Sequence, residues 1–175
     1  MSVPVVRRLK AIGARDLGGL CDVLIDCVEA GASVNFMWPM TRDKAERFWN
    51  GVGESLARNE RALVVAQDAD GEILGTAQAI WAPQENQPHR ADIAKMLVRP
   101  NARRRGIGAL VLAAAERAAF EAGRTLLVLD TASADAERLY ERAGWQRVGT
   151  VPKYALMPDG PLCSTVFYYK DLSER

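Results

Sequence analysis

The residues best suited to chemistry lie in the stretch VRPNARRRGIGALVL, residues 98–112, where three consecutive arginines run into two glycines. An apolar helical pattern follows them. The first turn of a helix carries unpaired backbone N–H groups and the positive end of the helix dipole. Glycines let these N–H groups approach an anion closely, and arginines add charge-assisted donors. The stretch therefore predicts a binding site for a phosphate or pyrophosphate.

The charge balance of the whole chain argues against nucleic-acid binding as the purpose of the arginines. The 175 residues include 23 Lys plus Arg and 22 Asp plus Glu, a formal net charge of +1. A nucleic-acid binder carries a wider basic excess, with aromatic residues interleaved. No stretch reaches the roughly 20 apolar residues of a membrane span, and the N-terminus does not resemble a secretory signal. We expect a cytoplasmic protein with no nucleic-acid or membrane partner.

The residues that could bind a metal are few and widely spaced. Cys21, Cys27 and Cys163 show no CxxC spacing, and His89 is the only histidine. Zinc sites need closely spaced Cys and His ligands. We therefore expect no metal, and free thiols in a reducing compartment.

The hydrophobic periodicity predicts one α/β domain over residues 1–175. Thr41 and Ser133 are expected helix N-caps, and Gly-containing turns separate several strands. The predicted order is β-α-α-β-β-β-α-β-α-β-β. The expected strands are 3–9, 61–67, 72–82, 91–99, 126–130, 145–155 and 162–172, and the expected helices are 16–30, 41–59, 105–123 and 133–143.

The arginine-glycine stretch fits neither of two familiar phosphate loops. The pattern GxxxxGK[ST] is absent, and Gly106 and Gly108 are not followed by the third glycine of GxGxxG. The remaining pattern is Arg-x-x-Gly-x-Gly, at Arg103, Gly106 and Gly108. Together with DTASADAERLYERAGWQRVG, residues 130–149, it resembles the GNAT superfamily of acyl-CoA-dependent N-acetyltransferases. The segments GASVNFM, PHRADIAK, LDT and PDG resemble the tabtoxin-resistance acetyltransferases more narrowly.

The resemblance implies an α/β fold of the GNAT type. This fold has a mixed, mostly antiparallel sheet of about seven strands and about four helices. A parallel pair, here the strands at 91–99 and 126–130, splays apart, and acetyl-CoA lies in the opening. Ser133 stands where the family often has asparagine. The residues expected to bind the co-substrate are Leu97, Val98, Arg99, Arg103, Arg104, Arg105, Gly106, Ile107, Gly108, Ala109, Ser133 and Tyr140.

Acetyl transfer to an amine needs a base for the ammonium and an acid for the leaving thiolate. The resemblance assigns the acid role to Tyr140. The alternative is that this tyrosine only packs in the core. Asp92, Asp130 or a water remain open as the base. Strand alternation places Asp92 on one face with Ala94, Met96 and Val98, where it could point into the cleft. His89 lies in a polar loop and is expected to be exposed.

The acceptor site is expected near the irregular, apolar segment NFMWPM. The alternative is that this segment only packs beneath its loop. The resemblance implies transfer of an acetyl group to a small-molecule primary amine, amino-acid-like or an antimetabolite or toxin, without a covalent enzyme intermediate. Two alternatives remain: a protein or peptide N-acetyltransferase, and a non-catalytic acyl-CoA-binding sensor. The sequence does not predict the oligomeric state. The candidate acceptor residues are Asn35, Phe36, Met37, Trp38, Trp81, Asp92 and Asp130.

Overall fold

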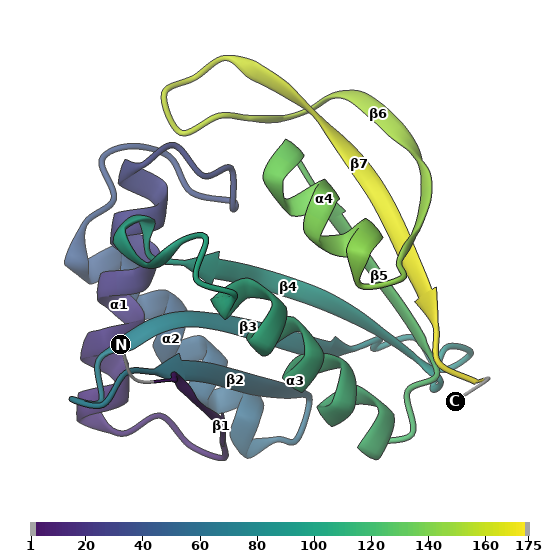
Figure 1. The fold of residues 1–175 in the computed structure, drawn as a ribbon, viewed down its shortest axis with the longest axis horizontal. Helices are drawn as coiled ribbons and strands as arrows, with labels where there is room; N and C mark the ends of the chain where they lie inside the picture. The colour runs from purple at the N-terminus through teal and green to yellow at the C-terminus, as the bar shows by residue number, and fades with distance from the viewer. Residues whose placement is uncertain (1–2, 174–175) are drawn as a thin grey trace.

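The computed structural model describes residues 3–173 and arranges them as one seven-stranded sheet with helices on both faces (Figure 1). The other four residues of the expected domain, 1–2 and 174–175, lie outside the described part. The order of elements is the one expected from the sequence. The elements are β1 Val5–Leu9, α1 Ala14–Glu29, α2 Arg42–Ala57, β2 Arg61–Gln67, β3 Ile73–Trp81, β4 Arg90–Val98, a 3₁₀ turn Pro100–Ala102, α3 Ile107–Glu121, β5 Leu126–Thr131, α4 Ala134–Arg142, β6 Gln146–Leu156 and β7 Leu162–Asp171.

The sheet is mixed, with the strand order β1-β2-β3-β4-β5-β7-β6. The pair β4–β5 is parallel, and the other five neighbouring pairs within residues 3–173 are antiparallel. This confirms the predicted architecture. A parallel pair needs a crossover connection, and α3 provides it between β4 and β5.

Two apolar cores lie on opposite faces of the sheet. The α1–α2 core joins these two helices to the sheet around Leu24, Trp49 and Leu63. The α3–α4 core covers the other face around Val111, and it includes Tyr140. The middle strands are covered on both sides, which explains the run of five buried residues in β2. No helix in the described chain has the length and apolar character needed to cross a bilayer.

The strands β4 and β5 pair at one end and separate at the other. Their register runs only from Arg90 opposite Leu126 to Asp92 opposite Val128. Figure 1 shows the two strands together near the C-terminus and diverging toward the opposite side of the molecule. The later residues of β4 therefore lack a strand partner on the β5 side.

A β-bulge interrupts β4 at Lys95. The register against β3 shifts between Gln78 opposite Ala94 and Thr76 opposite Leu97, and Lys95 has a φ of 49°. Ile93 is buried in the α3–α4 core, whereas Leu97 is buried in the α1–α2 core. In an uninterrupted strand, residues four apart share a face. The expected single face from Asp92 to Val98 is therefore wrong, because the extra residue reverses the alternation.

Local sequence signals set several helix boundaries. The Thr41 side chain accepts a hydrogen bond from the Lys44 amide at 3.3 Å, and Ser133 accepts one from Ala136 at 3.3 Å. Both predicted N-caps are confirmed. The helix expected from residue 105 begins instead at Ile107, because Gly106 has a φ of 77°, in the left-handed region that a right-handed helix excludes.

The 31–40 loop meets the β6–β7 hairpin, although the two segments are far apart in sequence. The Trp38 amide donates to the Pro158 carbonyl at 3.0 Å, and the Ser33 hydroxyl donates to the Leu156 carbonyl at 3.2 Å. The Trp38 indole N–H also donates to the Val28 carbonyl at 2.9 Å. These bonds connect the end of α1 to the hairpin.

Candidate functional site

A groove of about 1260 Å³ opens where β4 and β5 separate. Its walls come from segments along most of the chain. They are the end of α1 with the loop up to Asn35, β4 from Ile93 to Val98, the start of α3, the end of β5, α4, and the β6–β7 hairpin. Expected site residues that line it are Asn35, Leu97, Val98, Arg103, Arg104, Gly106, Ile107, Gly108, Ala109, Asp130, Ser133 and Tyr140.

One end of the groove has the features of a phosphate site. Gly106 caps α3 with a left-handed backbone, and the amides that follow it belong to the first helical turn, which lacks intrahelical acceptors. A Cβ on Gly108 would lie 3.2 Å from the Leu139 side chain, so this glycine allows α4 to approach closely. Arg103 and Arg104 line the same end. These residues fit the diphosphate of a coenzyme A group.

The end of β4 supplies a backbone donor at the opening. The Arg99 amide donates to the Leu74 carbonyl on β3 at 2.9 Å. Neighbouring residues of a strand direct their N–H groups to opposite sides, so the Val98 N–H is directed toward the gap beside β5. A donor there can polarise a thioester carbonyl. The Val98 carbonyl is occupied by Arg103 Nε at 3.3 Å and by Cys27 Sγ at 3.4 Å.

Arg99 and Arg105 do not line the groove, contrary to expectation. The Arg99 amide is used by the sheet, and its guanidinium forms ion pairs with Asp26, at 2.8 Å, and with Glu72. Arg99 therefore fastens the end of β4 to α1 and to the β2–β3 turn. Arg105 is exposed.

Tyr140 is a buried phenol on the groove wall, with only 4% of its surface exposed. Its ring lies between those of Trp145 and Tyr168, at centroid distances of 6.0 and 5.9 Å. Burial raises the pKa of Tyr140 well above its ordinary value, and the Asp130 carboxylate raises it further. The phenol therefore keeps its proton even at a pH near 10, where an ordinary tyrosine ionises, so Tyr140 carries a proton that it can donate.

Asp130 lies at the end of β5, on the groove wall. Its Oδ2 accepts a hydrogen bond from the Thr165 hydroxyl at 2.6 Å. The hydroxyl fixes one carboxylate oxygen on β7 and leaves the carboxylate on the wall that an acceptor would meet. An ammonium group is attracted to such a position, and its proton has an acceptor there.

Asp92 and Trp81 lie outside the groove, so their expected placement is wrong. Asp92 belongs to the part of β4 that is still paired with β5, and its carboxylate forms an ion pair with Arg90 at 2.6 Å. The Trp81 ring stacks under the Arg124 guanidinium at 5.3 Å. His89 is exposed and also outside the groove, as expected.

The segment NFMWPM divides between the groove and its support. Asn35 lines the groove with a φ of 76°, a conformation that asparagine tolerates better than most residues. Phe36 packs edge-on against Phe48 at 5.3 Å and belongs to the α1–α2 core. Met37 and Trp38 do not line the groove, and Trp38 instead joins α1 to the hairpin. Two of these four candidates, Phe36 and Trp38, therefore hold the loop in place.

Sequence reasoning missed several residues of the groove. Lys95 lines it because the bulge redirects its side chain; burial lowers the pKa of this lysine, whereas Asp130 opposes the shift. Burial likewise raises the pKa of the Cys27 thiol on the groove wall. No local pattern marks these two residues. Arg138 and Arg142 on α4 also line the groove. Each lies two residues from Tyr140, so helical spacing does not place them on the same face as Tyr140.

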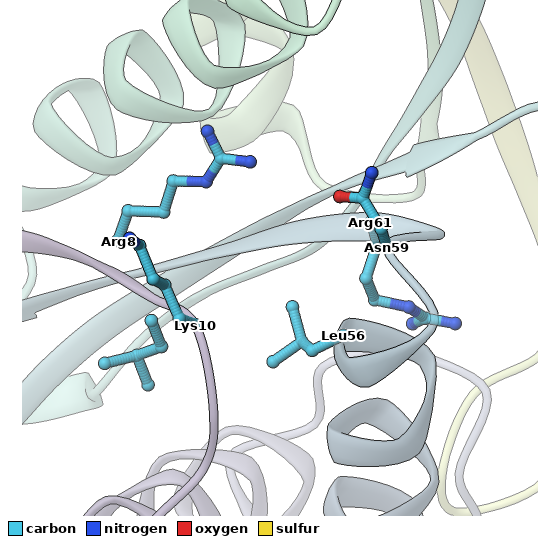
Figure 2. A pocket seen from close by; sticks show the side chains of 6 residues that line it. Arg8, Lys10, Leu56, Asn59 and Arg61 are labelled. Atoms are coloured by element: carbon cyan, nitrogen blue, oxygen red, sulfur yellow. The ribbon is translucent and has the colours of Figure 1, made fainter.

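A second hollow, of about 300 Å³, lies between β1, the end of α2 and the start of β2. Figure 2 shows that the guanidinium groups of Arg8 and Arg61 point in different directions. The Arg61 guanidinium donates hydrogen bonds to the Ser55 hydroxyl at 2.8 Å and to the Gln78 side-chain oxygen at 2.7 Å. The cations of this hollow do not converge on one position, so we assign it no chemistry.

The fold and the groove define an acetyltransferase-type protein, and the comparisons with known proteins give its family. The profile of the Acetyltransferase (GNAT) family matches residues 24–145. The chain therefore belongs to the GNAT family of acetyltransferases. It is 35% identical over 132 residues to an uncharacterized N-acetyltransferase from the hisH-hisA intergenic region of Azospirillum brasilense, a match covering 74% of this chain and 76% of that protein.

Two solved structures share the fold at lower identity. A phosphinothricin acetyltransferase of Sinorhizobium meliloti in complex with acetyl-CoA has a TM-score of 0.83 and 19% identity, covering 99% of this chain and 90% of that one. A ribosomal-protein-alanine N-acetyltransferase of Brucella melitensis has a TM-score of 0.79 and 23% identity, covering 96% and 99%. Their names give different acceptors, so these likenesses establish the fold alone.

Proposed function

We propose that the protein transfers an acetyl group from acetyl-CoA to the primary amine of a small molecule, of the amino-acid or antimetabolite type. The observation that carries this proposal is the convergence of three features on one groove. These are the anion-binding start of α3, the protonated phenol of Tyr140 and the carboxylate of Asp130.

The residues of the groove suggest a direct transfer. Asp130, which lines the groove where Asp92 does not, takes the proton from the acceptor ammonium, either directly or through a water. The Val98 N–H polarises the thioester carbonyl, and Tyr140 returns a proton to the leaving sulfur. The raised pKa of Cys27 keeps it a thiol, and a thiol is a poor nucleophile. This supports attack by the amine itself, without an acyl-enzyme at Cys27.

The contact between the 31–40 loop and the β6–β7 hairpin favours a small acceptor over a peptide. The Trp38–Pro158 and Ser33–Leu156 bonds join two walls of the groove. A peptide chain needs an open channel across a surface, whereas a small amine needs only a pocket. The presence of both Tyr140 and Asp130 disfavours the sensor alternative, which would need neither.

The test is an acetyl-CoA turnover screen with amino acids, polyamines, aminoglycosides and short peptides, read as release of free thiol. Calorimetry with acetyl-CoA runs in parallel. We expect micromolar binding and turnover with at least one small amine. Binding without turnover of any amine would establish the sensor, and turnover of peptides alone would establish the peptide acetyltransferase. Absence of acetyl-CoA binding would overturn the proposal entirely.

A further inference from the structure

Lys95 occupies a strained backbone position on the wall of the groove. Its φ of 49° lies in the left-handed region, which is sterically unfavourable for a residue other than glycine. The bulge directs the side chain to the α1–α2 face, where its ammonium lies 5.6 Å from the centre of the Phe48 ring. Bulges next to active sites commonly redirect one side chain in this way. The strained position therefore presents a specific cation to the groove.

The Lys95 ammonium has no carboxylate at contact distance within residues 3–173. Three groups face it: Phe48 from α2, Arg61 from β2 and Asp130 from β5. Arg61 repels it, and the Asp130 carboxylate attracts it only from beyond ion-pair distance. Burying a charge without a partner is unfavourable. A ligand anion placed beside Lys95 would supply the missing partner.

This cation is separate from those at the phosphate end of the groove. Arg103 and Arg104 precede α3, which covers the opposite face of the sheet from Phe48. Asp130 and Lys95, in contrast, both line the groove, and the Asp130 carboxylate acts electrostatically on the Lys95 ammonium. A cation and an anion on different strands thus line one groove without forming an ion pair with each other. A molecule carrying both charges complements such a pair better than a simple amine does.

We infer that Lys95 binds a carboxylate of the acceptor while Asp130 receives its amine, so that the acceptor is a zwitterion of the amino-acid class. This inference rests on the proposed acetyl transfer. It makes Lys95 a specificity-determining residue, because an amine without a carboxylate leaves the Lys95 charge unpaired. Polyamines and aminoglycosides, which carry positive charge alone, are then poor acceptors.

The experiment compares an amino acid with its carboxamide, which differs by one negative charge. The amino acid is the one turned over best among the 20 standard L-amino acids. We expect the wild-type kcat/KM to be about 10- to 100-fold higher for the acid. The substitution Lys95→Met should bring this ratio near one, and Lys95→Arg, which keeps the charge, should retain most of it. Lys10→Met, at an exposed lysine outside the groove, is the matched control.

Three outcomes would overturn the inference. The first is a carboxamide as good as the acid with wild type. The second is an equal loss for acid and amide in Lys95→Met. The third is a loss of both in Lys95→Arg, which would identify Lys95 as a proton acceptor, because arginine does not release its proton. If Lys95→Met does not fold, two measurements still test the inference. They are the ratio of kcat/KM for the acid and its carboxamide with wild type, and the same ratio with Lys95→Arg. Better turnover of amines without a carboxylate defeats only this inference, whereas no turnover of any amine defeats the proposed function as well.

Discussion

The two ends of the groove are built in different ways. The phosphate end consists of consecutive residues from Arg103 to Ala109, and its donors are backbone N–H groups fixed by the start of one helix. The end of the groove that we propose for the acceptor consists of Lys95, Asp130 and Thr165, from three strands, and residues of the 31–40 loop line the same groove. A backbone site depends on helix geometry and tolerates changes of side chain, whereas a side-chain site depends on each residue. The substitutions below test this difference, beginning with the largest expected effect.

Replacement of Gly106 by tryptophan should abolish the phosphate site. The indole would occupy the space above the first turn of α3, and we expect acetyl-CoA affinity to fall about 1000-fold through loss of charge-assisted hydrogen bonds. Gly123→Trp is the control, because Gly123 lies just beyond the C-terminal end of the same helix with a φ of 78° against 77° at Gly106. A Cβ added at either glycine would meet no atom within 4 Å in the described chain, apart from those of its immediate chain neighbours and the helix backbone. Calorimetry and thermal unfolding should show similar losses of stability but a loss of affinity for Gly106→Trp alone. Equal affinities would place the coenzyme elsewhere.

Replacement of Tyr140 by phenylalanine should lower kcat about 100-fold, the lower end of the range for a general acid, with little change in acetyl-CoA affinity. Because burial and Asp130 raise its pKa, the wild-type phenol should keep its proton as the pH rises to about 10, where an ordinary tyrosine ionises. The wild-type kcat should therefore not fall over pH 7–10 because of Tyr140. A decline in that range that disappears in Tyr140→Phe would contradict this.

Tyr168→Phe is the matched control for Tyr140. Tyr168 is fully buried against Tyr140, but its hydroxyl donates to Glu137 and Glu141 at 3.0 and 3.1 Å, and it does not line the groove. We expect a loss of about 1 kcal/mol in stability and a kcat within about twofold of wild type. Equal losses of kcat in the two variants would reduce Tyr140 to a packing residue.

Asp130→Asn should lower kcat/KM about 10-fold at neutral pH, less than the loss at Tyr140, because water in the groove can also accept a proton. Asp92→Asn should stay within about twofold, since this residue is paired with Arg90 outside the groove. Steady-state kinetics of both variants at neutral pH test this, and a larger loss of kcat/KM at Asp92 would restore Asp92 as the base.

The smallest expected effect separates two helix caps. Ser133→Ala and Thr41→Ala should each cost about 1 kcal/mol of stability, because each removes a side-chain acceptor from a helix N-terminus. Ser133 also lines the groove, so its loss should weaken acetyl-CoA binding about threefold. Thr41 lies outside the groove and should leave the affinity unchanged. A change of affinity in both variants, or in neither, would confine Ser133 to its role as a cap.

Sequence periodicity predicted the fold well because its signals are local. The strand at Arg61–Gln67, the caps at Thr41 and Ser133, and the helix after Gly106 each depend on residues within about one turn or one strand of themselves. The phosphate end of the groove could be predicted for the same reason, since its donors are the amides of consecutive residues. The position of Asp92 was wrong because Asp92 lies in the part of β4 that is still paired with β5, and its residues alone do not show where the two strands separate. The bulge at Lys95 comes after that point, and it reverses the faces of the residues that follow it.

The amino-acid sequence predicts the architecture, and it assigns Gly106, Gly108 and Tyr140 to one site; these three residues line the same groove. Packing of the whole chain sets which carboxylate lines the groove and which residues of NFMWPM support the loop. It also brings Lys95 and Asp130 to the same groove. These features depend on the position of the bulge in β4, on the point where β5 separates from β4, and on the contact between the β6–β7 hairpin and the 31–40 loop. Contacts between segments so distant in sequence arise from packing of the whole chain, which short-range patterns do not encode.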